Sequence, residues 1–415
     1  MVSFVRSLIT PIFSLFVIIL GNNFLLTVVP LRMKLDGYST EVVGYLTAAY
    51  FAGLMIGALL INRLLEGVGH IRAFAAFAAF FTVLSMLQGV FVHPAFWLVL
   101  RFFSGICMAG IFVTIESWLL VKSSVHMRGK ALSIYMITTF AGQSLGQLFL
   151  DISDPSTIYP FCLGVILASV AIVPLALTKT RAPIIEEPSI LNPLKLFKTS
   201  PLGTIGAFLS GCILGSVYGL LPLYTFNLDF THSQIAAVMS ITILGGLILQ
   251  YPVGIISDRL DRRKVLFSLS LFTGICSLLM GLFPTQSFEL FLVLAFIFGG
   301  LSFATYPVSV SHACDLIDSK DLVAATGGML LFYGTGAIVG PILISYPMNY
   351  FGNSGFFHFI TFISLVLTLF TLMRVIKKTP TAKEDKLPYS NMPRTTPMAS
   401  ELDPRAETSE EESNP

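Results

Sequence analysis

Residues 254 to 264 read GIISDRLDRRK, and this short charged stretch interrupts an otherwise apolar region of the chain. An apolar run precedes it at 233–256, and another follows at 265–284. Each run has the length of about twenty residues that an α-helix needs to cross roughly 30 Å of hydrocarbon. The stretch is therefore expected to be a tight loop between two membrane helices, with its basic residues at one membrane surface.

The rest of the chain repeats this alternation of apolar runs and polar breaks. Of 415 residues, 54% are hydrophobic and 12% are charged, and the mean hydropathy is +0.81. An average soluble domain has about 25% charged residues, so a chain of this composition needs a bilayer as its solvent. The apolar runs lie at approximately 8–31, 41–62, 72–92, 96–121, 131–150, 158–177, 202–226, 233–256, 265–284, 288–313, 323–346 and 355–374.

These runs form two sets of six, which predicts an all-α membrane protein with twelve transmembrane helices. We expect an N-terminal six-helix bundle at 1–177, a cytoplasmic linker at 178–201 and a C-terminal six-helix bundle at 202–374. The remaining tail, 375–415, is rich in Pro, Ser, Thr and Glu, a composition that favours disorder, and we expect it to be disordered in the cytoplasm. The first run continues without a small-x-small cleavage site, so it is interpreted as a retained helix.

Lysine and arginine are unevenly distributed between the loops of the two sides. The loops of one side carry only Arg32 and Lys34, whereas those of the other side carry most of the basic residues before the tail. Positive charge is retained on the cytoplasmic side of a membrane. We therefore expect a multi-pass inner-membrane protein with both termini in the cytoplasm.

Several other classes of function find no support in the sequence. The net charge of +2, with no basic groove, argues against nucleic-acid binding. The five cysteines lie singly, with no CxxC spacing, and are interpreted as packed thiols. No Walker loop, HExxH or Ser-His-Asp pattern predicts an enzyme, and neither a cofactor nor a metal site is predicted. The expected partners are a small solute, membrane lipid and, if transport is coupled, protons, and we expect a monomer.

The two sets of runs are similar to each other. GNNFLLTVVPL, which ends at Leu31, aligns with the stretch that ends GSVYGLLPL, and this places Pro30 on Pro222. The next segments align with Gly53 on Gly245. Duplication of a six-helix unit produces two pseudo-symmetric bundles with a cavity between them.

The stretch at 254–264 resembles the GxxxDRxGRR/K loop of the major facilitator superfamily, although Asp261 stands where that family usually has glycine. The loop after the second run is a degenerate copy that lacks the first glycine and the Asp-Arg pair. In such loops a small residue permits close helix approach, while acid and base groups pair across the two halves. The predicted cytoplasmic gate comprises Glu66, Gly69, Arg72, Gly254, Asp258, Arg259, Arg262 and Arg263.

Further stretches are similar to the YcaD-like branch of this superfamily. They include VVPL near Pro30, RFFSG from Arg101, GSVYGLLPLY from Gly215, and the Gly340-Pro341 pair. The resemblance implies secondary transport of a small solute by alternating access, and it does not identify the solute. A facilitated uniporter, a proton-coupled symporter or antiporter, and a receptor or scaffold without transport all stay open, because fold does not establish function.

Two charged residues lie within the fourth run. Arg101 is costly inside a membrane, so we expect it either to face the bundle interior or to snorkel to the surface. Glu116 lies about 22 Å further along the helix. A carboxyl group in an apolar setting favours its neutral form, so Glu116 is a candidate for proton coupling. Alternatively, it pairs with arginines of the cytoplasmic loops as part of the gate.

His312 and Asp315 share a helix face and are interpreted either as a proton relay, with His312 as a second proton-coupling candidate, or as a capping pair. Uncharged polar groups also occur inside apolar runs, where burial without a partner costs about 1 to 3 kcal/mol. Each should therefore either line a wet cavity or bond between helices. These candidates for the substrate path, together with Arg101, are Asn22, Asn23, Gln143, Gln147, Tyr218 and Gln250.

Overall fold

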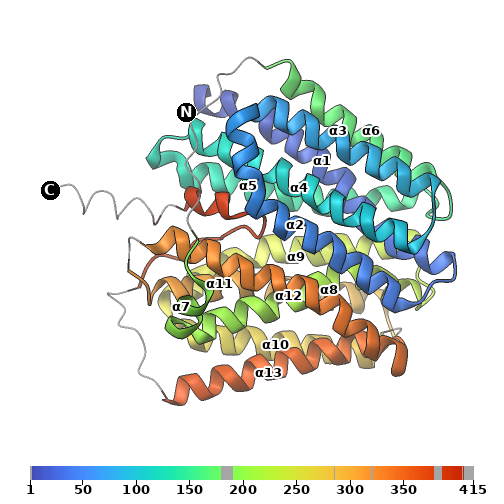
Figure 1. Ribbon diagram of the computed structural model, residues 1–415. Helices are drawn as coiled ribbons and strands as arrows, with labels where there is room; N and C mark the ends of the chain where they lie inside the picture. The colour runs from blue at the N-terminus through green and yellow to red at the C-terminus, as the bar shows by residue number, and fades with distance from the viewer. Residues whose placement is uncertain are drawn as a thin grey trace.

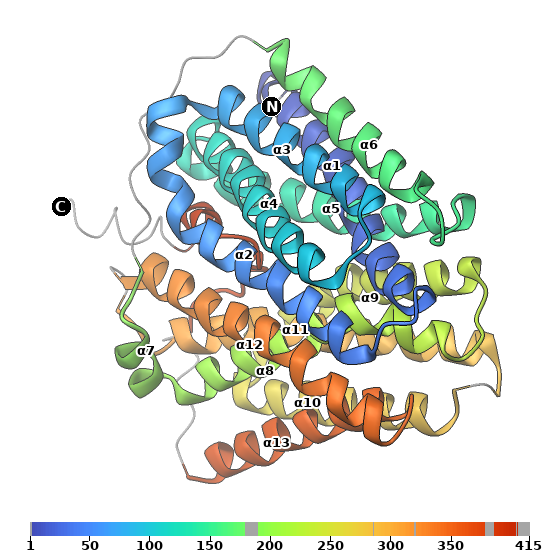
Figure 2. The same cartoon turned by 45° about the vertical axis from the view of Figure 1, so that its right-hand side comes forward.

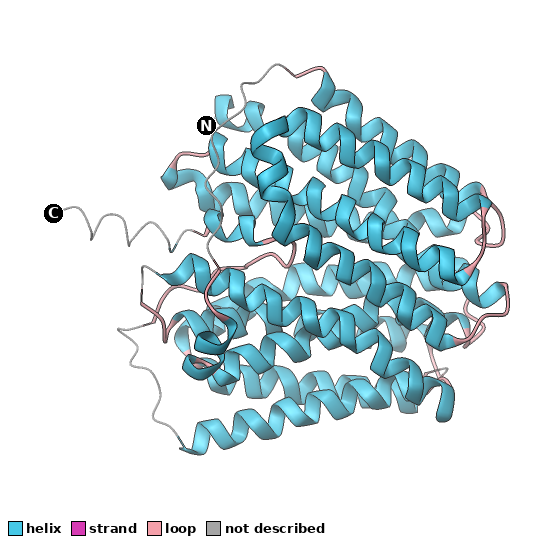
Figure 3. Ribbon diagram, in the orientation of Figure 1, coloured by secondary structure: helices cyan, strands magenta, loops and turns pink. Residues whose placement is uncertain are grey.

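All the apolar runs fold into α-helices in the computed structural model (Figure 1). The structure describes residues 2–178, 190–284, 286–318, 321–377, 386–403 and 405, without the side chains of residues 2–7, 62, 63, 66 and 125. No strand occurs in these ranges (Figure 3). The long helices are α1 (Val2–Leu35), α2 (Thr40–Val68), α3 (His70–Val90), α4 (Pro94–Lys122), α5 (Arg128–Gln147), α6 (Tyr159–Ala176), α8 (Pro201–Phe226), α9 (His232–Arg259), α10 (Arg262–Leu282), α11 (Phe288–Cys314), α12 (Leu322–Tyr350) and α13 (Gly355–Lys377).

Within the described ranges, four short helical elements accompany the long ones. They are α7 (Pro193–Thr199) and three 3₁₀ turns, η1 (Val125–Met127), η2 (Leu148–Ile152) and η4 (Pro397–Leu402). The helix ends follow local sequence signals. Thr231 and Gln234 form a capping box at the start of α9, and Asp261 caps α10 by accepting a bond from the Arg263 backbone N–H. Capping therefore explains an aspartate at the position where the superfamily loop usually has glycine.

The long helices are suited to a membrane. Among the described residues, 11 helices are long and apolar enough to span one. Of the twelve long helices, α5 is the one outside that set, because its 20 residues include a polar stretch of Gly, Gln, Ser and Thr. Large apolar side chains also face outward, including Phe80 of α3, Ile166 of α6, Phe272 of α10 and Phe362 of α13. Such a surface is stable against lipid and would aggregate in water.

The helices form two bundles, α1–α6 and α8–α13, which lie side by side in both views (Figures 1 and 2). The bundles meet through α2 with α12, α5 with α9 and α1 with α8. Each bundle contains an equivalent pair of helices that approach each other closely at a glycine. A Cβ atom on Gly53 of α2 would collide with the Phe102 carbonyl oxygen of α4, and one on Gly245 of α9 would collide with the Phe296 carbonyl oxygen of α11. The alignment of Gly53 with Gly245 thus corresponds to equivalent helix contacts.

The expectation of a disordered tail is wrong for residues 386–403 and 405. These residues lie between the two bundles, where η4 packs on α4, α5 and α12 (Figure 1). Several of their side chains are buried, among them Met392, Met398 and Leu402. The composition of the tail predicted disorder because it offers few apolar groups of its own. The segment is ordered because the bundles supply the apolar surface that it lacks.

Candidate functional site

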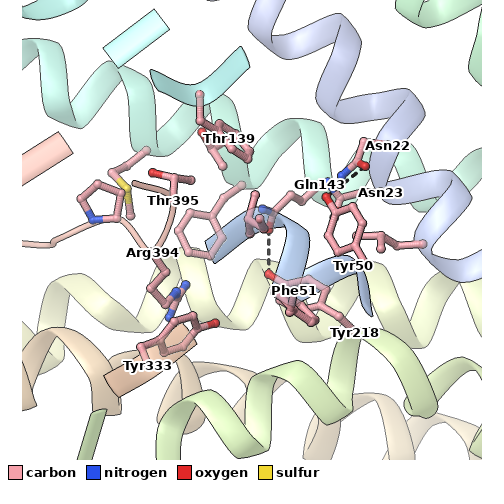
Figure 4. A pocket seen from close by; sticks show the side chains of 16 residues that line it. Asn22, Asn23, Tyr50, Phe51, Thr139, Gln143, Tyr218, Tyr333, Arg394 and Thr395 are labelled. Atoms are coloured by element: carbon pink, nitrogen blue, oxygen red, sulfur yellow. Dashed lines mark hydrogen bonds between the residues drawn. The ribbon is translucent and has the colours of Figure 1, made fainter. Parts of the chain in front are cut away.

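A cavity of about 80 Å³ lies between the two bundles (Figure 4). Helices α1, α2, α4 and α5 line it from one bundle, and α8 and α12 line it from the other. The lining side chains that these helices supply are amides, hydroxyls, aromatic rings and aliphatic groups, with no charged residue among those described. Such a lining offers hydrogen bonds and aromatic faces to a bound molecule.

Four of the residues proposed for the substrate path line this cavity together. Asn22 and Asn23 come from α1, Gln143 from α5 and Tyr218 from α8. The Tyr218 hydroxyl donates to Gln143 Oε1 at 2.9 Å, which joins the two bundles across the cavity. The Tyr50 hydroxyl donates to Asn22 Oδ1 at 3.1 Å. The polar groups are therefore oriented by partners and still border open space.

The two remaining amide candidates are both glutamines, and neither lines this cavity. Gln147 accepts a hydrogen bond from Thr27 Oγ1 at 2.5 Å and donates to the Asn23 carbonyl at 3.3 Å, so it links α5 to α1. Gln250 lines a separate groove of about 720 Å³ between α5 and α9. Both polar atoms of its buried side-chain amide lack a hydrogen-bond partner within the described part of the chain.

Arg101 faces the interior of its bundle and does not snorkel. Its side chain is only 2% exposed, and its guanidinium carbon lies 4.7 Å from the centroid of the Tyr50 ring. A cation over an aromatic face is an attractive pair. Because Tyr50 lines the cavity, Arg101 supports the cavity wall from behind without lining it.

Residues of the tail also line the cavity, and sequence reasoning missed them. Pro393, Arg394 and Thr395 complete its lining on one side (Figure 4). The guanidinium carbon of Arg394 lies 4.7 Å from the Phe303 ring centroid, 5.7 Å from that of Phe140 and 6.0 Å from that of Tyr333. Arg394 also donates to the Phe303 carbonyl at 3.0 Å. The only signal in the sequence was an arginine within a region whose composition predicts disorder.

Glu116 is completely buried next to the same tail segment. Its carboxylate accepts hydrogen bonds from the Tyr135 hydroxyl at 2.5 Å and from the hydroxyls of Thr395 and Thr396. No basic side chain pairs with it among the described residues. The expected alternative, a latch between Glu116 and loop arginines, is not formed in this conformation.

The charged loop between α9 and α10 forms a network within its own bundle. Arg262 donates to Asp315 Oδ1 at 2.8 Å, to the Ser311 carbonyl at 2.5 Å and to Asp258 Oδ1 at 3.3 Å. Burial raises the pKa of the Asp315 carboxyl to about 6, although the charge of Arg262 lowers it. Asp315, the C-cap residue of α11, pairs with Arg262 of α10, and the relay or capping pair that was expected for His312 and Asp315 stays a prediction.

In this conformation Asp258 and Arg262 contact their own bundle and the tail, and the pairing of the loop with the other bundle stays a prediction. Backbone N–H groups of the tail donate hydrogen bonds to two carboxylates of this network. The backbone N–H of Tyr389 donates to Asp258 Oδ1 at 2.8 Å, and that of Leu387 donates to Asp315 Oδ1 at 3.1 Å. The Tyr389 ring lies on Gly254, where a Cβ atom would come within 2.6 Å of it. The small residue accommodates the tail here.

The remaining gate residues lie at or near the ends of helices. Arg263 pairs with Asp261 at 2.7 Å, and Arg259 is exposed at the end of α9. In the degenerate copy, Gly69 has a φ of 81° and forms the turn between α2 and α3. Arg72 is exposed in the first turn of α3, and the Glu66 side chain lies outside the described residues.

At the opposite end of the molecule the two bundles touch directly. The hydroxyls of Tyr45 and Tyr346 lie 3.0 Å apart, and Asn349 Nδ2 donates to Glu41 Oε1 at 2.6 Å. The Ser144 and Ser240 hydroxyls lie 2.6 Å apart and join α5 to α9. The cavity is thus closed by helix contacts at this end, here called the far end, and by the tail at the end of the charged loop, here called the motif end.

Comparison with known proteins agrees with this architecture. The Major Facilitator Superfamily sequence profile matches residues 12–241 and 203–400. The MFS-type transporter YcaD of Escherichia coli is 29% identical over 377 residues, which cover 90% of this chain and 97% of that protein. The nucleoside transporter NupG has a similar structure, with a TM-score of 0.76 at 15% identity, over 90% of this chain and 100% of that one. A D-xylose-proton symporter matches with a TM-score of 0.67 at 16% identity, over 92% and 99%.

Proposed function

Because the chain belongs to the major facilitator superfamily of membrane transporters, we propose that it carries a small solute across a bacterial inner membrane by alternating access. The observation that carries the proposal is the cavity between the two bundles, with polar groups from both at its wall. A solute bound there would contact both bundles, and rocking of one against the other would expose it to each side in turn.

The distribution of basic residues supports a cytoplasmic motif end. On that orientation the structure corresponds to an inward-facing state. The external side is closed by the direct contacts at the far end, such as that between Tyr45 and Tyr346. On the cytoplasmic side the bundles are separated by the tail. The linker (178–201) would lie on the same cytoplasmic side, as would the tail.

The charged loop is proposed to act as the gate of the cytoplasmic side. In the present state the tail backbone occupies Asp258 and Arg262. When that side closes, the tail must leave, and these groups become available to the other bundle near Gly69 and Arg72. A pairing of this kind would exist only in the closed state. Its role would be to bias the conformational equilibrium.

Coupling to protons is proposed to occur at Glu116. Its carboxyl group is buried, has no cationic partner among the described residues, and lies beside the cavity-lining Thr395. A buried carboxyl without a cationic partner is costly when ionised, so its proton can be exchanged as the cytoplasmic side opens and closes. Uniport is the alternative if Glu116 does not exchange a proton.

Uptake by the purified full-length protein in liposomes tests the proposed function. A panel of nucleosides, pentoses, organic acids and organic cations would be offered with and without a pH gradient. We expect uptake of at least one class, and its loss in Gln143→Ala, which removes the amide that bridges the bundles at the cavity. Uptake that is unchanged in Gln143→Ala would place the path elsewhere. Binding of a solute without any uptake would favour a receptor or scaffold.

A further inference from the structure

Arg394 is the only charged residue among the described residues that line the central cavity, and it belongs to the tail. The helices themselves leave the cavity uncharged. The tail segment at 393–395 places one cationic side chain at the wall of this cavity (Figure 4). The arrangement resembles an occupied binding site in which the occupant is part of the same chain.

The surroundings of Arg394 are chemically specific for a cation. Aromatic rings from both bundles surround the guanidinium group: Phe140 belongs to α5, Phe303 to α11 and Tyr333 to α12. Aromatic faces attract cations, and the attraction grows when water is excluded. No carboxylate forms an ion pair with Arg394 among the described residues. The rings therefore form an aromatic cage whose contacts suit a flat, weakly hydrated cation.

Neighbouring residues hold the segment in place on both sides of Arg394. Thr395 and Thr396 donate hydrogen bonds to Glu116, and the Tyr389 backbone N–H donates to Asp258. None of these contacts requires a charge at position 394. The position of the arginine in the cage is thus separable from the anchoring of the tail, which allows its role to be tested by a point substitution.

We propose that Phe140, Phe303 and Tyr333 form a subsite for an organic cation of the guanidinium type, and that Arg394 occupies it as an internal blocking ligand. The proposal rests on the proposed function, because it takes the cavity to be the solute path. A solute would have to displace Arg394 before it could bind. The apparent association constant of the solute is then the intrinsic constant multiplied by the fraction of time that the cage is free of Arg394.

Equilibrium binding of phenylguanidinium to the full-length protein tests the proposal, with phenylurea as the neutral probe of the same shape. If the tail occupies the cage about nine-tenths of the time, Arg394→Ala should bind phenylguanidinium about tenfold more tightly than the wild type. Phenylurea should show no such gain. Lys377→Ala, which removes an exposed cation at the end of α13, should behave as the wild type.

A second substitution tests the cage itself. Phe303→Leu, placed in the Arg394→Ala background, should abolish the gain, and Phe140→Leu serves the same purpose if the first variant does not fold. An Arg394→Ala protein that binds phenylguanidinium no better than the wild type would overturn the proposal, as would an equal gain for phenylurea. Because binding is measured independently of transport, the test of the cation subsite can be distinguished from the test of the proposed function. Cation binding without any uptake would contradict only the proposed function, and uptake of other solutes without this gain would contradict only the cation subsite.

Discussion

At the scale of single residues, glycines and buried polar groups of the same type have different structural roles at different positions. Gly53 and Gly245 let helices approach until backbone meets backbone, whereas Gly254 makes room for the Tyr389 ring of the tail. Asn22 and Gln143 remain polar inside apolar helices because each has a partner and borders the cavity. A small residue in a membrane helix is therefore not evidence of one particular role.

The close approach at Gly53 predicts a loss of stability when a methyl group is added. Gly53→Ala would force α2 away from the α4 backbone, and we expect a cost of about 1–3 kcal/mol from overpacking. Gly67→Ala is the matched control, because nothing lies within 4 Å of a Cβ atom there. Thermal unfolding in detergent should show a lower Tm for Gly53→Ala alone. Equal Tm values for both variants would contradict the packing argument.

The carboxyl group of Glu116 predicts a separation of coupling from exchange. Glu116→Gln keeps the size of the side chain and one of its two acceptor oxygens but cannot release a proton. Uptake driven by a pH gradient should be lost, whereas counterflow exchange should persist, because exchange needs conformational change without net proton movement. Gradient-driven uptake at the wild-type rate in Glu116→Gln would eliminate Glu116 as the proton site.

Sequence reasoning identified the helix-borne residues of the cavity better than the tail-borne ones. Asn22, Gln143 and Tyr218 stand out because a polar group in an apolar run demands an explanation. Arg394 could not be found in this way, because it lies in a polar segment where an arginine is ordinary. Its placement depends on rings that lie far away in the sequence, such as Phe140 and Phe303.

At the scale of elements, local sequence signals determine the helices, whereas contacts with the two bundles determine the structure of the tail. The polar stretch that makes α5 the least apolar long helix lies at the junction of the bundles, where α5 meets α9. The charged loop was correctly placed between α9 and α10, but its partners were not predicted. Those partners belong to the tail, and a segment without its own apolar face becomes ordered only against a surface that is formed by other elements.

The anchoring of the tail on Gly254 predicts how it can be released. Tyr389→Ala removes the ring that packs on α9 and should increase the exposure of the peptide bond after Arg394. Limited trypsin digestion, read by mass spectrometry, should show faster cleavage there than in the wild type. Tyr159→Ala, which alters a tyrosine that is 70% exposed at the start of α6, is the control. Identical cleavage rates in Tyr389→Ala and the wild type would show that the ring does not anchor the tail.

At the scale of the whole molecule, the two bundles are joined at the far end and separated by the tail at the motif end. The sequence duplication indicated both the pseudo-symmetry and a cavity between the bundles. Which end is closed could not be predicted, because the same sequence must support both states of an alternating-access cycle. The state seen here is set by contacts such as Asn349 with Glu41 at one end and by the tail at the other.

The central claim is that the bundles rock against each other, and distance measurement between spin labels tests it most directly. One pair would lie at the far end, at Ser39 and Asp229, and one at the motif end, at Lys130 and Lys264, all of which are exposed. In the full-length protein in lipid nanodiscs, Tyr389→Ala, which releases the tail, should shorten the motif-end distance and lengthen the far-end distance together, relative to the wild type. A change at one end alone, or no change at either end, would contradict alternating access in this molecule.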